Sequence, residues 1–169
     1  MYDNHFHIGI TGHRRLPEEK IPVITWSVKD FYADIKKLNE SKITVLSSLA
    51  EGADMLCAKL ALDMGFRLAV PLPMNVAEYR KDFSAYVAGE FDHLLSMADE
   101  VFVVTPEEPV PYNPSRGFYY RQAGIYVAKK CDFLLAVWDG VENDTPDGAG
   151  TWETIKLARK FGRTVSRFW

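Results

Sequence analysis

The 169-residue chain has little of what marks metal centres and membrane proteins. Its only two cysteines, Cys57 and Cys131, are far apart and match no metal-ligand spacing. No apolar run approaches the roughly 20 residues that a bilayer-spanning helix needs, and no signal peptide is recognisable. We therefore expect a cytoplasmic protein with reduced thiols, no membrane contact, no metal and no cofactor.

The chain also lacks a basic excess. Its formal net charge is -3, whereas general nucleic-acid binders normally carry a positive balance. On this ground we do not expect nucleic acid to be the partner, although a local basic patch stays possible. The composition, 47% hydrophobic and 25% charged, is that of a globular protein, and no linker or repeat divides it. We expect a single domain over residues 1–169.

Apolar, β-rich runs alternate with segments of helical periodicity along the whole chain. Four prolines between residues 106 and 114 predict a loop there. The runs predict strands at 5–11, 42–46, 66–72, 100–105, 132–137 and 164–169, the last at an edge of the sheet. The periodic segments predict helices at 17–38, 54–64, 77–97, 118–130 and 151–161.

This alternation is typical of parallel strands joined by right-handed helical crossovers. The run at 132–137, DFLLAV, is almost wholly apolar, as expected of a strand covered on both faces. We predict an α/β fold, specifically a Rossmann-like three-layer sandwich with a mostly parallel sheet. Ligands of such sheets bind beyond the carboxyl ends of the strands, so the loops that follow the strands hold the candidate site.

The first such loop, IGITGHR, contains Gly12, His13 and Arg14. Glycine permits a tight turn, and backbone amides that follow a strand can bind an anion. Arg14 can neutralise a phosphate, and His13 can donate a hydrogen bond to it. The alternative is an ordinary turn with a solvated arginine. The loop matches neither GxGxxG nor the Walker A pattern.

The second loop, SSLAEGAD, offers Ser47, Ser48, Glu51 and Gly52 as phosphate-binding candidates. Hydroxyl groups and a glycine at the start of a helix suit an anion. However, Ser48 and Glu51 also have the spacing of a capping box, and taken alone the segment favours a helix cap.

The third loop, DGAGTWE, opens the last predicted helix with Gly148, Gly150 and Thr151. Two glycines let a ligand approach the backbone, and Thr151 can face a phosphate. Glu153, in the first turn, can bind a ribose or serve only as a carboxylate near a helix start. Two further candidates follow other strands: Arg80 for a phosphate, and Asp139 for a ribose hydroxyl or for fixing its loop.

Together these motifs resemble the SLOG superfamily, which includes the LOG-type nucleoside monophosphate phosphoribohydrolases once labelled lysine decarboxylases. The stretches IGITGHR, SSLAEGAD, LAVPLP, YVAKKCDFLLAVWDG and GAGTWE carry the resemblance over nearly the whole chain. LOG-type enzymes have a PGGxGTxxE motif. PDGAGTWE keeps its proline, last two glycines, threonine and a glutamate, but it has Asp147 in place of one glycine and one residue fewer between the threonine and the glutamate. The resemblance implies a nucleotide-like ligand, a dimer and, for an enzyme, catalytic roles for Glu153 and Arg121.

Three functions follow from this reading. The first is binding or sensing of a small nucleotide-derived ligand at the carboxyl ends of the strands. The second is hydrolysis of the N-glycosidic bond of a nucleoside 5′-monophosphate, with Arg121 orienting the substrate and Glu153 stabilising charge. The third, a nucleic-acid-binding module, agrees least with the acidic balance, and a basic groove would favour it.

Overall fold

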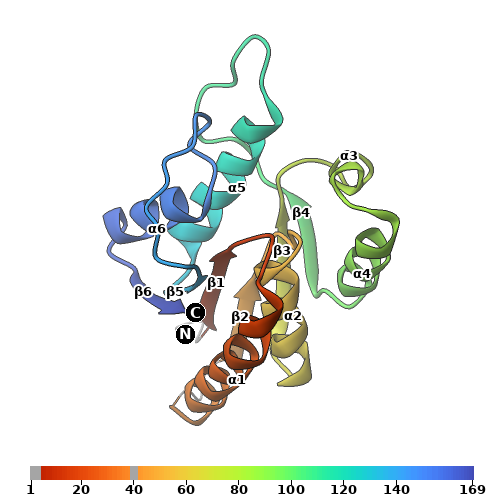
Figure 1. Ribbon diagram of the computed structural model, residues 1–169. Helices are drawn as coiled ribbons and strands as arrows, with labels where there is room; N and C mark the ends of the chain where they lie inside the picture. Colours follow the sequence, from red (N-terminus) through yellow and green to blue (C-terminus); the bar gives the residue numbers. More distant parts are fainter. Residues whose placement is uncertain (1–4, 39–41) are drawn as a thin grey trace.

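The structure is a computed structural model, which describes residues 5–38 and 42–169 (Figure 1). At its centre lies a six-stranded sheet in the order β4-β3-β2-β1-β5-β6, with every neighbouring pair parallel. This confirms the predicted Rossmann-like three-layer fold and goes beyond a mostly parallel sheet. The strands are β1 (His5–Gly12), β2 (Lys42–Leu46), β3 (Arg67–Leu72), β4 (Glu100–Val103), β5 (Phe133–Val137) and β6 (Thr164–Phe168).

Helices cover both faces of this sheet. On one face α1 and α2 pack together and α4 packs on α2, while α5 and α6 pack together on the other (Figure 1). The helices are α1 (Ile21–Leu38), α2 (Ala53–Asp63), α3 (Val76–Tyr79), α4 (Ala85–Ser96), α5 (Arg116–Lys130) and α6 (Thr151–Lys160), with short 3-10 turns η1 (Glu18–Lys20) and η2 (Arg80–Asp82).

The central strands feed two hydrophobic cores, because successive side chains of a strand point to opposite faces. In β5, Leu135 and Val137 join the core under α1, α2 and α4. Leu134 and Ala136 join the core under α5 and α6. All four side chains are fully buried. The continuous apolar run predicted for this strand is therefore what two covered faces require.

The segment at 77–97, predicted as one helix, is instead broken into α3, η2 and α4. The chain turns at Phe83, whose backbone is extended and whose ring packs against Phe91 in the core. Ser84 then caps a new helix by accepting a hydrogen bond from the Val87 amide. The single-helix prediction is wrong because a partly buried aromatic ring that packs on the core and a serine cap outweigh continuous helical periodicity.

Elsewhere the predicted elements are present, with bounds that shift by a few residues. The strand expected to reach residue 105 ends at Val103, for example. Within the described ranges, none of the helices combines the length and apolar character needed to cross a membrane.

Candidate functional site

A cavity of about 400 Å³ opens at the carboxyl edge of the sheet. It lies where the strand order reverses, because the chain leaves β1 toward β2 on one side and returns to pair β5 with β1 on the other. The loops after β1, β2 and β5 and helices α2, α5 and α6 all contribute to it. Its polar and aromatic lining comprises Thr11, His13, Arg14, Ser48, Asp54, Tyr79, Tyr120, Trp138, Asn143, Thr145, Thr151, Trp152 and Thr154.

The loop after β1 brings all three of its predicted residues, Gly12, His13 and Arg14, to the cavity. The His13 ring lies 3.1 Å from a carboxylate oxygen of Asp139, measured from Nε2. Asp139 itself does not line the cavity; the same oxygen accepts a hydrogen bond from the Val141 amide at 2.9 Å, which fixes the start of its loop beside His13. The Arg14 guanidinium lies 5.2 Å from the centre of the Tyr120 ring, a cation-π contact that directs the arginine along the cavity wall.

The side chains of the loop after β2 mainly make structural hydrogen bonds within the fold. The Ser47 hydroxyl donates to the Asp54 carbonyl at 3.2 Å, and the Ser48 hydroxyl donates to the Pro71 carbonyl at 2.8 Å. Ser48 is thus no helix cap, and the capping-box interpretation is wrong. Glu51 is exposed. Of the four predicted residues in this loop only Ser48 lines the cavity.

Gly52 is the N-cap of α2 and holds that helix start against the loop after β1. Its φ is +86°, and a Cβ there would lie 2.3 Å from the Arg14 carbonyl oxygen. The amide of Ala53, the first residue of α2, donates to the His13 carbonyl at 3.0 Å. Protein atoms therefore already occupy the start of α2, and Gly52 serves packing rather than ligand binding.

Asp54, in the first turn of α2, is a buried carboxyl group in the cavity wall. It is 7% exposed, and desolvation raises its pKa to about 7, against the opposing effects of the Ala50 amide and Arg14. This residue is not among the site candidates selected from the sequence. No cluster of three or more His, Cys, Asp or Glu side chains that could hold a metal occurs in the described ranges.

The loop after β5 reaches the cavity at Gly150 and Thr151, whereas Gly148 lies behind it against Arg121. Glu153 is 6% exposed. One of its oxygens accepts hydrogen bonds from the amide and the hydroxyl of Thr145. The other is buried without a partner among the described residues. Glu153 therefore ties the loop to α6.

The pair predicted for catalysis does not meet in the cavity, because neither Arg121 nor Glu153 lines it. Arg121 binds both carboxylate oxygens of Glu108, the nearer at 3.0 Å, and donates to the Gly148 carbonyl at 3.1 Å. These contacts occupy its guanidinium and hold it against the loop after β5. The geometry gives no support to glycosidic hydrolysis by this pair.

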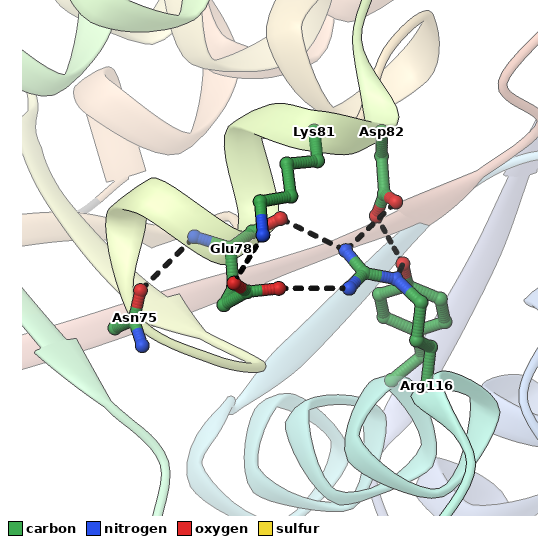
Figure 2. Close-up of polar contacts among 6 residues, drawn as sticks. Asn75, Glu78, Lys81, Asp82 and Arg116 are labelled. Atoms are coloured by element: carbon green, nitrogen blue, oxygen red, sulfur yellow. Dashed lines mark hydrogen bonds and ion pairs between the residues drawn. The ribbon is translucent and has the colours of Figure 1, made fainter.

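Arg80, predicted to bind phosphate, also lies elsewhere. It forms two 2.8 Å hydrogen bonds with Asp92 of α4. Another arginine, Arg116, does not line the cavity but ties α5 to the segment after β3 (Figure 2). It binds Asp82 at 2.8 Å and the Glu78 carbonyl at 2.9 Å.

Tyr120 completes this cluster, because its hydroxyl donates to Asp82 and accepts from Arg116. The ring is thus held in place beneath Arg14. Trp138 and Trp152, at either end of the loop after β5, stack with centroids 5.6 Å apart and planes 9° from parallel. Sequence reasoning missed these two rings, although one directly follows the apolar strand and the other opens the last helix.

Comparisons with known proteins match the fold to DNA-processing proteins. DNA processing protein A from Streptococcus pneumoniae superposes with a TM-score of 0.63 at 17% identity, over 96% of this chain and 50% of that one. The second is from Helicobacter pylori, whose structure is described for its single-stranded DNA binding mode. It superposes with a TM-score of 0.61 at 14% identity, over 96% of this chain and 64% of that one. The chain therefore spans about half to two thirds of these neighbours.

No protein-family model matches the sequence, and a search of curated proteins finds no significant match. The fold is the one expected from the SLOG resemblance. A relation to LOG-type enzymes stays a prediction.

The structural neighbours correct two predictions, that the ligand is a small nucleotide-derived signal and that nucleic acid is not the partner. One protein of this fold is described as a single-stranded DNA binder. The second prediction rested on the net charge of -3, which averages over the whole surface. Affinity for a strand depends instead on the local groups that meet its phosphates and bases.

Proposed function

We propose that this chain binds single-stranded nucleic acid, with one segment of the strand in the cavity at the carboxyl edge of the sheet. The observation that carries the proposal is a convergence: an open helix start, an arginine that forms no ion pair with any described residue, and several aromatic rings all line one cavity. The likeness to DNA processing protein A supports the same reading.

The phosphate would lie at the start of α6. The amides of Thr151, Trp152 and Glu153 have no intrahelical acceptor, and no other acceptor for them is found in the described part of the chain. Thr151 and Trp152 line the cavity. A helix start with free amides attracts an anion through both hydrogen bonds and the helix dipole. Arg14, exposed and with no carboxylate within 4.0 Å in the described ranges, would add a formal positive charge.

The bases would stack on Tyr120 or Trp152, which line the same cavity and are partly exposed, whereas Trp138 is buried behind Trp152. Stacking on an aromatic ring contributes about 1–3 kcal/mol per base and tolerates any base, because every base has a π-face. Bases of a duplex are already stacked and paired, so their faces are not available to these rings. The arrangement therefore favours a single strand over a double strand.

The proposal fits the other features of the chain. Cys57 and Cys131 are both free and buried, in accord with a cytoplasmic location. The motifs that resemble the SLOG superfamily lie at the cavity or support its walls, and we assign the whole of residues 1–169 to one such domain. The dimer expected from that resemblance stays a prediction.

The test is fluorescence anisotropy with a labelled 20-nucleotide oligo(dT), a hairpin duplex of the same length and unlabelled thymidine monophosphate as competitor. We expect binding of the single strand, weaker binding of the duplex and little competition by the mononucleotide. Arg14→Gln should weaken single-strand binding about tenfold, because a phosphate contact in the cavity is lost.

The matched control is Lys59→Gln, which removes the same charge from an exposed position on α2 outside the cavity. Equal affinity for duplex and single strand, or equal effects of the two substitutions, would contradict the proposed site. Tight binding of the mononucleotide with no binding of the oligonucleotide would overturn the proposed function.

A further inference from the structure

Helix α6 carries a row of cations on one side. Lys156, Arg159 and Lys160 are all exposed and stand at positions i, i+3 and i+4, which neighbour one another on a helix surface. The opposite side of α6 is apolar, with Ile155 and Ala158 buried in the core. We call these three cations the α6 row.

The α6 row begins at the cavity. Trp152, one turn before Lys156, lines the cavity. The Lys156 ammonium lies 5.5 Å and the Arg159 guanidinium 5.6 Å from the centre of the Trp152 ring. The same ring stacks on Trp138. An aromatic surface inside the cavity therefore continues without interruption into a cationic surface outside it.

The charge of the row is largely uncompensated. Within residues 5–38 and 42–169, neither Arg159 nor Lys160 has a carboxylate within 4.0 Å, and Lys156 pairs only with Asp144 of the loop after β5. The single acid of α6 is Glu153, which is buried and bonded to Thr145. In a chain of net charge -3, this helix is a local site of positive potential.

We infer that the phosphate backbone of a bound strand leaves the cavity past Trp152 and follows the α6 row. This inference rests on the proposed function and adds the path of the strand outside the cavity. From Trp152 to Lys160 the helix rises about 12 Å at 1.5 Å per residue, which suits about two or three nucleotides. The row holds the strand by charge, so it adds affinity without base preference.

The test compares a trinucleotide, dT3, which occupies the cavity, with a 20-nucleotide oligo(dT), which also reaches the row. The variant replaces all three cations together: Lys156→Gln, Arg159→Gln and Lys160→Gln. A matched control, Lys29→Gln, Lys37→Gln and Lys59→Gln, removes three exposed charges from α1 and α2 on the opposite face of the sheet. Circular dichroism and thermal unfolding verify that both variants fold.

Binding is measured by calorimetry for dT3 and by anisotropy at several salt concentrations for the longer strand. Each phosphate contact on a single strand contributes about 0.7 to the slope of log K against log [salt]. The α6 variant should therefore lower the slope by about 2 and weaken the 20-nucleotide strand at least about tenfold at low salt. Its dT3 affinity should stay within about twofold, as should both affinities of the control.

If the slope of log K against log [salt] is unchanged in the α6 variant, or changes equally in the control, the strand does not follow the α6 row. Such a result would leave the proposed cavity site intact. An equal loss for dT3 and the longer strand would also overturn the path, because the row would then act on the cavity itself. If the unmodified protein binds neither oligonucleotide, the proposed function fails and the path fails with it.

Discussion

Two helix starts face the same cavity, yet only one of them is open to an anion. The start of α2 is filled by the protein, because the Ala53 amide donates to the His13 carbonyl and Asp54 lies buried in its first turn. The start of α6 has an extended Gly150 as N-cap, no side-chain cap, and free amides beside the cavity. Both starts follow glycine-containing loops. What separates them is whether another segment of the chain already satisfies their amides.

The largest expected effect concerns Asp54, at the filled start of α2. Burial raises the pKa of Asp54 from 3.8 to about 7, so the folded protein keeps a proton that the unfolded chain releases above about pH 4. The free energy of unfolding should therefore fall as pH rises from about 4 to about 7, by roughly 4 kcal/mol in total. Asp54→Asn should remove this fall, as measured by urea unfolding across that range. Glu51→Gln, which changes an exposed acid just before α2, should leave the fall in place, and an unaltered pH profile in Asp54→Asn would refute the assignment.

The next effect concerns how tightly α2 is seated. Gly52→Ala should lower the free energy of unfolding by about 3 kcal/mol, because the positive φ is strained for alanine and the Cβ meets the Arg14 carbonyl oxygen. Gly65→Ala has a similar φ, +78°, but open space around it, so it should cost only about 1 kcal/mol. Thermal unfolding of the two variants gives the difference, and equal losses would mean that the close approach of the two loops contributes nothing.

The smallest expected change in free energy comes from a substitution that fills the open start of α6. Thr151→Asp puts a carboxylate at the first position of α6, where it suits the free amides and the helix dipole, so the melting temperature should not fall. Binding of a 20-nucleotide oligo(dT) should weaken about tenfold, since the carboxylate competes with a phosphate for the same amides. Ser96→Asp adds the same charge at an exposed position of α4, outside the cavity and away from α6, and should leave affinity unchanged. Equal losses in the two variants would argue against α6 as the phosphate site.

The fold could be predicted from the sequence because its signals are local. Apolar runs such as DFLLAV predict strands, and the helical periodicity predicts helix bounds within a few residues, with Gly65 and Gly162 just after the ends of α2 and α6. The one broken helix shows the limit of this approach. Phe83 packs against the core because α4 folds back over α2. The periodicity of the sequence gives no information about that contact.

The site was less accessible to sequence reasoning because it depends on partners far away along the chain. Arg80 and Arg121 have the chemistry of phosphate ligands, but Asp92 and Glu108 take up their guanidinium groups. Arg14, with the same chemistry, lies over the ring of Tyr120 and forms no ion pair within the described ranges. Nothing in the residue types distinguishes these three arginines. Whether an arginine is free to bind a phosphate depends on which acidic side chains the fold places next to it.

The reversal of strand order at β1 has a consequence for the order of assembly. The loops after β1 and β2 belong to the first part of the chain, whereas α5, α6 and the loop after β5 belong to the second. A folding intermediate in which only β1 to β4 have paired would have Arg14 and Asp54 in place but neither Trp138 nor the start of α6. The two halves of the cavity meet only when β5 docks beside β1. The ability to bind single-stranded nucleic acid would therefore appear late in folding, in the same step that completes the sheet.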